Sequence, residues 1–503
     1  MSYTATVHGE RFVFNDLREL LAKANERKSG DELAGIAAAT ERERVAAKLA
    51  LADVRVADFH ACPLVDDEVT AVTTGAIEPA AADAIASLTI GQLRELILAP
   101  QFPALWQATL RDGFLPEVAA AVAKIMSDLD LVLAARPLRT VTKCRNTMGE
   151  PGTLGGRIQP NHPTDDLAGI LASIVDGLAY ACGDAVIGVN PATDSAAKTA
   201  QLLIGMNEFT AALGIPTQTC VLAHVTTQLA ALEAGAPVDL LFQSLAGTEE
   251  ANRSFGINLS LLQEARQAVI ASHRQRPADF VGQQCVYIET GQGSALSSNS
   301  HHGIDQLTLE ARAQGAAKAL DPFLINTVVG FIGPEYLADS RQITRAGLED
   351  HFCGKLQGLP MGVDVCYTNH VDADQNTNDD LLMLLTSAGC NYFMGLPAGV
   401  DVMLGYQSTS YHDVASMRRL SQLGPAPEFA RWAESVGILI NGEISGGDGG
   451  GGWAGGGGAG VWAGGSSWGG DSPGVGARRA ERMARLAELI VARHAAPALG
   501  VAR

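Results

Sequence analysis

Short apolar runs that end abruptly in polar residues recur eight times along the middle of the chain. Each run is continuous and rich in β-branched side chains, a pattern typical of strands that are buried on both faces of a parallel sheet. The runs occupy residues 155–160, 185–191, 218–227, 239–247, 285–294, 323–335, 362–370 and 391–399.

Helix-compatible stretches such as residues 166–180 and 195–213 separate these runs. Eight strand–helix units over about 250 residues indicate a (β/α)8 barrel. We therefore predict an α/β protein in which residues 151–444 form a TIM barrel. In this fold the polar residues at the C-terminal ends of the strands converge on one mouth, where the chemistry takes place.

Two further regions flank the predicted barrel. Residues 1–150 predict a mainly helical N-terminal domain, with a break at the Ser-Gly-Asp of residues 29–31 and one further helix over residues 117–136. Residues 445–503 predict a low-complexity C-terminal tail, because residues 445–476 hold 17 of the 55 glycines and three of the five tryptophans. An amphipathic helix over residues 477–494 ends the tail, and it either docks on a partner or stays solvated.

Composition and charge narrow the class of protein. The 503 residues are 47% hydrophobic and carry a formal net charge of −19, which argues against binding to nucleic acid or to anionic membrane surfaces. No apolar run approaches the roughly 20 residues that span a bilayer, and the first residues lack the features of a signal peptide. The eight cysteines form no CxxC pair, so we expect reduced core thiols in a cytoplasmic protein.

Motifs that resemble metal or nucleotide sites fail on inspection. The acidic series from Asp372 to Asn378 resembles the start of an EF-hand, but Thr377 replaces the required glycine and Met383 replaces the bidentate glutamate. The pair His301-His302 has no acidic or histidine partner at a suitable spacing, and the GxGxxG matches in the tail follow no strand. We predict no metal site.

Polar residues at the strand ends carry the candidate chemistry. Glu289 and Asp364 follow different strands and could together bind a small cation such as an amine. Arg157, Gln159 and Asn190 could bind a hydroxyl or carbonyl oxygen. Taken singly, each of these residues could equally cap a neighbouring loop. Together they favour a site for a small amino alcohol.

Longer blocks of sequence point to a family. GRIQPN, GDAVIGVNPATD, ETGQGSALS, NTVVGFIGPEYL and GLEDHFCGKLQGLPMGVDVCYTNHVDADQN are similar to the large subunit of ethanolamine ammonia-lyase. The similarity is collinear from about residue 12 to residue 442. The departures are a few extra residues near 271–282 and the whole tail, and neither touches a motif residue.

The resemblance implies the catalytic large subunit of an adenosylcobalamin-dependent carbon–nitrogen lyase, which converts ethanolamine to acetaldehyde and ammonia by a radical reaction. It implies that Arg157, Glu289 and Asp364 are catalytic and that these residues bind the substrate with Gln159 and Asn190. The apolar walls of the substrate pocket would be Phe331, Met394 and Leu404, and the residues that contact the cofactor would be Pro191, Gln243, Ser297 and Met403. The base-off cobalamin motif DxHxxG is absent, which agrees with the base-on cofactor of the family.

The resemblance also implies partners. These are a small subunit and further copies of the large subunit, arranged as a trimer of dimers, in the cytoplasm or inside a bacterial microcompartment. Two other functions stay open. A metal-dependent barrel lyase or hydrolase is disfavoured because His224 is the only histidine inside a predicted strand, where a core histidine is the more common role. A non-catalytic assembly subunit is disfavoured because every substrate position is intact.

Overall fold

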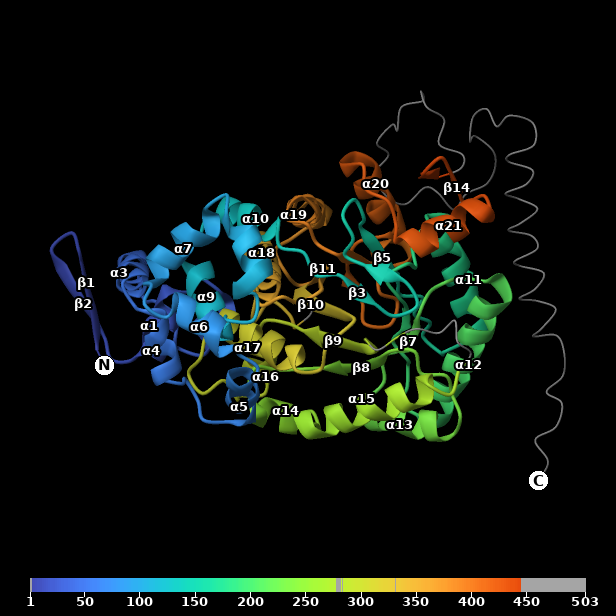
Figure 1. Cartoon of the computed structure of the whole chain (residues 1–503), viewed down its shortest axis with the longest axis horizontal. Coiled ribbons are helices and arrows are strands. Elements are labelled where there is room, and N and C mark those ends of the chain that lie inside the picture. The colour runs from blue at the N-terminus through green and yellow to red at the C-terminus, as the bar shows by residue number, and fades with distance from the viewer. Residues whose placement is uncertain (1, 277–281, 283, 331, 445–503) are drawn as a thin grey trace.

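The computed structural model describes residues 2–276, 282, 284–330 and 332–444. Eight parallel strands follow one another around a nearly closed barrel in the order β7-β6-β5-β12-β11-β10-β9-β8 (Figure 1). The predicted TIM barrel is therefore confirmed. The strands are β5 (Gly155–Ile158), β6 (Ile187–Val189), β7 (Thr219–Val221), β8 (Leu241–Ser244), β9 (Val286–Thr290), β10 (Leu324–Gly330), β11 (Met361–Thr368) and β12 (Tyr392–Gly395).

Helices cover the outside of the barrel, which explains why the strand runs are apolar throughout. Side-chain oxygens at the helix starts accept backbone N–H groups, for example Asp166 before α11 and Ser195 before α12. Both helices were predicted. The helices of the barrel region are α11 (Leu167–Ala179), α12 (Ala196–Leu213), α13 (Val225–Glu233), α14 (Glu249–Ser254), α15 (Leu259–His273), the short α16 (Ser294–Ser297) directly after β9, α17 (Gln306–Lys318), α18 (Ser340–Leu356), α19 (Gln375–Ser387), α20 (Tyr411–Ser421) and α21 (Pro427–Ser435).

The barrel has a seam between β7 and β8, which form no backbone ladder with each other in the described residues. The side chain of Gln228 on α13 bridges the seam. Its Nε2 donates to the carbonyl oxygens of Ala223 and Phe242, both at 2.7 Å, and its Oε1 accepts the N–H of Phe242 at 3.0 Å. The backbone N–H and carbonyl groups of Phe242 therefore bond to the side-chain amide of Gln228, where a neighbouring strand would otherwise supply their partners.

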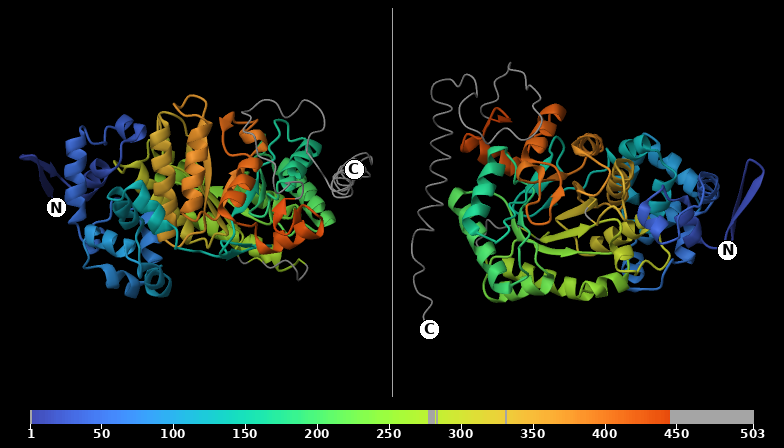
Figure 2. Two further views of the ribbon diagram at one scale, coloured as in Figure 1. Left: turned by 90° about the horizontal axis from the view of Figure 1, so that it is seen from above. Right: turned by 180° about the vertical axis from the view of Figure 1, so that it is seen from behind.

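The N-terminal region lies beside the barrel and is mainly helical (Figures 1 and 2). Buried ion pairs join it to α17 and α18: Lys28 contacts Glu349 at 2.7 Å, and Lys124 contacts Asp305, the residue before α17, at 2.9 Å. Its helices are α1 (Leu17–Ala24), α2 (Ser29–Leu33), α3 (Glu41–Ala52), α4 (Val56–Ala61), α5 (Glu68–Gly75), α6 (Pro79–Ile85), α7 (Ile90–Leu98), α8 (Phe102–Leu105), the π-helix η1 (Trp106–Leu110), α9 (Pro116–Lys124) and α10 (Asp128–Ala135).

Three details differ from the sequence prediction. The single helix over residues 117–136 is wrong, because Ser127 caps a new helix by accepting the N–H of Asp130, and α9 and α10 are therefore separate. The predicted break in this segment is present but lies at residues 25–28, between α1 and α2, because residues 29–31 already belong to α2. A projecting antiparallel hairpin of β1 (Tyr3–Val7) and β2 (Glu10–Phe14) precedes the helices and was not predicted.

Short elements complete the structure. The strand β13 (Tyr406–Gln407) pairs with the end of β11, and the 3-10 helix η2 (Pro397–Gly399) follows β12. Two small antiparallel pairs are β3 (Thr142–Lys143) with β4 (Thr147–Met148), and β14 (Leu439–Ile440) with β15 (Glu443–Ile444). None of the described helices is both long and apolar enough to cross a membrane. The predicted tail over residues 445–503 lies outside the described residues.

Candidate active site

Three of the predicted site residues form one hydrogen-bonded network in the barrel lumen. Arg157, on β5, is fully buried, and its Nη1 donates to Oε1 of Glu289 on β9 at 2.9 Å. Its Nη2 donates to Oε1 of Gln159, two residues further along the chain. A buried guanidinium is stable only with such charged or polar partners, so the three side chains hold one another in a defined orientation.

Two residues that sequence reasoning missed complete the environment of Glu289. The hydroxyl of Tyr287 donates to Oε1 of Glu289 at 2.5 Å, and Nδ2 of Asn326 on β10 donates to the same oxygen at 3.4 Å. Strand alternation could have identified Tyr287, which is two residues before Glu289 and so points the same way. Asn326 is the register partner of Glu289 on β10. Within the described part of the chain, Oε2 of Glu289 accepts no hydrogen bond, and the side chain is 16% exposed.

Asp364 lies on β11 and is fully buried. Its Oδ1 accepts a hydrogen bond from Oγ of Ser408 at 2.5 Å, whereas its Oδ2 is buried without a partner in the described residues. Burial raises the pKa of Asp364 to about 7, and the negative charge of Glu289 adds to this effect. The Ser408 hydroxyl and the Arg157 guanidinium oppose it. Asp364 therefore titrates near neutral pH, and a bound cation would favour its ionised form.

Several buried polar atoms of the lumen lack a partner among the described residues. They are Nε of Arg157, Oδ1 of Asn326 and Oδ2 of Asp364. Buried polar groups in native proteins are normally hydrogen-bonded. A small polar ligand that carries both donors and acceptors would satisfy them, so the lumen has the chemistry of a binding site.

One of the two predicted amides, Gln159, is held by a carboxylate that the sequence reasoning overlooked. Nε2 of Gln159 donates to Oδ2 of Asp401 at 2.9 Å, and Nδ2 of Asn161 donates to the same oxygen at 2.6 Å. Oδ1 of Asn161 in turn accepts the backbone N–H of Asn190, after β6, at 2.8 Å. The signal for Asp401 was an acidic residue in the apolar segment VDVML just beyond the last strand.

The predicted apolar wall is partly visible. Met394, on β12, is buried with Val328, Cys366, Leu396 and Tyr406 in one small cluster. The predicted wall residue Leu404 lies on the rim with 49% of its surface exposed. Phe331 lies outside the described residues.

The predicted cofactor contacts surround the same mouth. Pro191 follows β6 and Met403 follows β12, and both are half-buried. Ser297 is exposed at the end of α16, and its hydroxyl donates to the carbonyl oxygen of Ser294 at 2.8 Å. Gln243, on β8, is buried, and its Oε1 accepts the N–H of Val225 at 3.0 Å. Gln243 on β8 thus also bonds across the seam between β7 and β8, to the first residue of α13.

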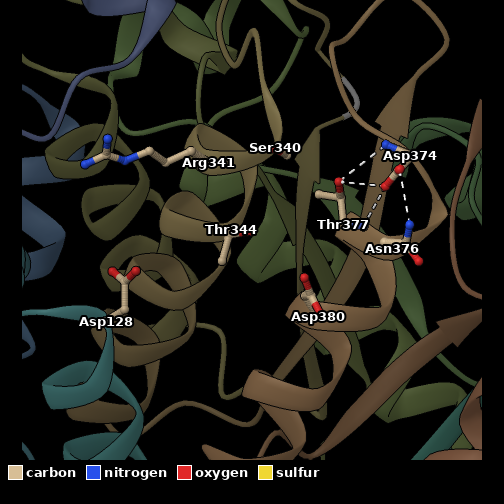
Figure 3. A pocket seen from close by; sticks show the side chains of 8 residues that line it. All are labelled: Asp128, Ser340, Arg341, Thr344, Asp374, Asn376, Thr377 and Asp380. Carbon is tan, nitrogen blue, oxygen red and sulfur yellow. Dashed lines mark hydrogen bonds between the residues drawn. The ribbon is translucent and has the colours of Figure 1, made fainter.

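A separate surface groove of about 370 Å³ lies between the first turns of α18 and α19 (Figure 3). No predicted substrate or cofactor residue lines it. Asp374, which the EF-hand comparison had singled out, caps α19 there by accepting the N–H of Thr377 at 3.2 Å. The placement of His224 on a strand is wrong, because this half-buried residue caps α13. In the described parts of the chain no three His, Cys, Asp or Glu residues are grouped to hold a metal ion.

Comparison with known proteins identifies close relatives. The family model described as ethanolamine ammonia lyase large subunit (EutB) matches residues 12–446. The ethanolamine ammonia-lyase large subunit of Escherichia coli K12 is 49% identical over 448 residues, which cover 88% of this chain and 98% of the relative. The corresponding subunit of Salmonella typhimurium is 48% identical over the same coverage.

Proposed function

The chain belongs to the family of ethanolamine ammonia-lyase large subunits, and from this premise we propose that it deaminates ethanolamine to acetaldehyde and ammonia with adenosylcobalamin as cofactor. The observation that carries the proposal is the polar lumen of the barrel. There Asp364 keeps an unpartnered carboxylate oxygen, and the network of Arg157, Gln159 and Glu289 stands beside it.

The two carboxylates are suited to the amino group of the substrate. An ammonium group placed against Oδ2 of Asp364 and Oε2 of Glu289 would form charge-assisted hydrogen bonds. These bonds are stronger than hydrogen bonds between neutral groups. Because the pKa of Asp364 is about 7, this residue can also accept or return a proton as the amino group leaves the carbon that carries it.

Arg157, Gln159 and Asn190 are suited to the hydroxyl end. The guanidinium Nε is buried and unpartnered, so it can donate to the hydroxyl oxygen and stabilise negative charge there. Glu289 fixes the guanidinium from the other side. All of these groups lie on or directly after barrel strands, which hold them in place while the substrate is enclosed and water is kept out.

The rim of the mouth fits a large ligand of mixed polarity. Val402 and Leu404 are 56% and 49% exposed and flank the half-buried Met403, so three apolar side chains adjoin on this rim. Pro191 and Ser297 lie on the same rim. We propose that Pro191, Gln243, Ser297 and Met403 hold adenosylcobalamin and that Leu404 contributes to the apolar wall of the substrate pocket. When bound, this group supplies a carbon radical that removes hydrogen from the substrate.

We further propose a small subunit as the partner that completes the cofactor site, and large subunits arranged as a trimer of dimers. The name of the relatives, a large subunit, implies that a smaller one exists. We expect the assembly in the cytoplasm, either free or within a microcompartment.

The experiment that tests this function uses the chain co-expressed with its small subunit. Ethanolamine and adenosylcobalamin are added, and acetaldehyde and the visible spectrum of the corrinoid are followed. We expect acetaldehyde and a spectral change that both require ethanolamine. Acetaldehyde formed with a divalent metal and no corrinoid would instead support a metal-dependent lyase. An assembled complex that forms no product would support an assembly subunit.

A further inference from the structure

Asp401 is a fully buried carboxylate whose hydrogen-bond partners in the described residues are all N–H donors. Its Oδ2 accepts from Gln159 at 2.9 Å and from Asn161 at 2.6 Å. Its Oδ1 accepts from the backbone amides of Met403 at 2.8 Å and Leu404 at 2.7 Å. None of these partners is a cation. An ionised carboxylate is an acceptor on both oxygens, so the four donors match this form of the side chain.

The contacts of Gln159 show why its orientation depends on Asp401. The oxygen of its amide accepts from Arg157, and the nitrogen donates to Asp401. Turning the amide over would place its NH2 group against the guanidinium and its oxygen against the carboxylate. Both contacts would then be repulsive, so Asp401 and Arg157 together select one orientation of the amide.

The second oxygen of Asp401 ties this amide to the rim. Met403 and Leu404 are the rim residues proposed above to contact cofactor and substrate, and their amides converge on Oδ1. The loop is closed on itself as well, since the N–H of Gly405 donates to the carbonyl oxygen of Asp401 at 2.9 Å.

We propose that Asp401 is a positioning residue that orders the substrate amide Gln159 and the rim loop 401–405 as one unit. Asn161 extends the unit to the backbone of Asn190. The inference rests on the proposed function insofar as Gln159 and Asn190 bind ethanolamine. The order of the loop itself does not depend on that function and can be measured in the apoprotein.

The test uses Asp401→Asn, which keeps the shape of the side chain but can accept on one side only. Its NH2 group must face either the NH2 groups of Gln159 and Asn161 or the backbone N–H groups of Met403 and Leu404, so one of the two pairs loses its acceptor. In the complete two-subunit enzyme we expect the KM for ethanolamine to rise at least about tenfold, with a smaller fall in kcat, because the change misorients a binding amide. In the apoprotein we expect faster hydrogen exchange of the peptide that contains residues 401–406.

A second substitution restores the pairing. In Gln159→Glu combined with Asp401→Asn, the new carboxylate at position 159 can accept both from Arg157 and from the new amide at position 401. We expect the double variant to regain at least half of the melting temperature and of the exchange protection that Asp401→Asn alone loses. A double variant less stable than the sum of the two single changes would overturn the proposal.

Asp184 provides a second buried carboxylate as the control, with Arg418 as an ionic partner that Asp401 lacks. It is also fully buried, lies before β6 at the opposite end of the barrel, and accepts hydrogen bonds from Gly156, Arg418 and Ala426, each at 2.8 Å. We expect Asp184→Asn to lower the melting temperature while the KM and the exchange of residues 401–406 stay as in the wild type. An unchanged KM in Asp401→Asn, or an equal rise in Asp184→Asn, would refute the positioning role. If the wild type makes no acetaldehyde, the function fails, but the exchange result still decides the role of Asp401.

Discussion

The buried carboxyl of Asp364 predicts an unusual response to the substitution Asp364→Asn: the variant loses activity but gains stability at alkaline pH. The ordinary pKa of an aspartate is 3.8, and burial raises that of Asp364 to about 7. Between these values the folded protein binds a proton that the unfolded chain does not. The free energy of unfolding of the wild type therefore falls as pH rises through this interval and levels off above about pH 7.

The size of the effect follows from the same two values. Each pH unit well inside the interval costs about 1.4 kcal/mol, so the wild type loses about 3 kcal/mol between pH 5 and pH 8, where ionisation of Asp364 is nearly complete. Asparagine does not titrate and avoids this loss. The NH2 group of the asparagine would occupy the place of Oδ2, which is buried without a partner in the described residues. This unpaired donor lowers the free energy of unfolding by about 1–3 kcal/mol, and the cost does not change with pH. For a folded part of about 440 residues, 3 kcal/mol corresponds to about 3 °C in melting temperature.

The assay is thermal unfolding of the apoprotein at several pH values from about 5 to about 8. We expect the difference in melting temperature between Asp364→Asn and the wild type to grow by about 3 °C in favour of the variant. Ser408→Ala checks the direction of the pH effect, because the Ser408 hydroxyl lowers the pKa of Asp364. Its removal should move the loss of stability to higher pH. Parallel profiles of wild type and Asp364→Asn would refute the reasoning.

Three further predictions concern activity and assembly. Glu289→Gln should lower kcat/KM by about 30- to 1000-fold, because the loss of a charge-assisted contact with the substrate ammonium costs about 2–4 kcal/mol; steady-state kinetics of the folded variant check this, and near wild-type turnover would contradict it. The chain without its small subunit should show little deamination with adenosylcobalamin, and full activity of the isolated chain would remove the need for the partner. A chain truncated after Ser445 should keep its activity, melting temperature and oligomer mass, since a glycine-dense segment buries too little surface to offset its ordering entropy; loss of any one would assign the tail a role in the assembly.

The barrel was predictable because its strands are buried on both faces and its helices begin at capping residues. Continuous apolar runs and side chains such as Asp166 and Ser195 record these features directly in the sequence. The hairpin of β1 and β2 was missed because its strands are short and half-exposed. The split between α9 and α10 was missed because Ser127 stands inside an otherwise helical pattern.

The candidate site was predictable to the extent that it lies at strand ends. Topology alone brings Arg157, Gln159, Glu289 and Asp364 into one lumen. Asp401 could not be found in this way, because it lies in a loop after η2 and reaches Gln159 only through the path of that loop. Its role depends on donors from two separate parts of the chain, residues 159–161 and residues 403–404, and no local spacing encodes the first pair.

The seam between β7 and β8 bears on how this barrel can change in evolution. At the other strand junctions the contacts are backbone ladders, which every residue type except proline can form. No point substitution easily removes them. At the seam the contacts to Phe242 come from the amide of one residue, Gln228. The seam is thus closed by side chains, those of Gln228, Asp239 and Gln243 among them, so the sequence at a few positions can tighten or loosen this junction while the ladders elsewhere stay unchanged.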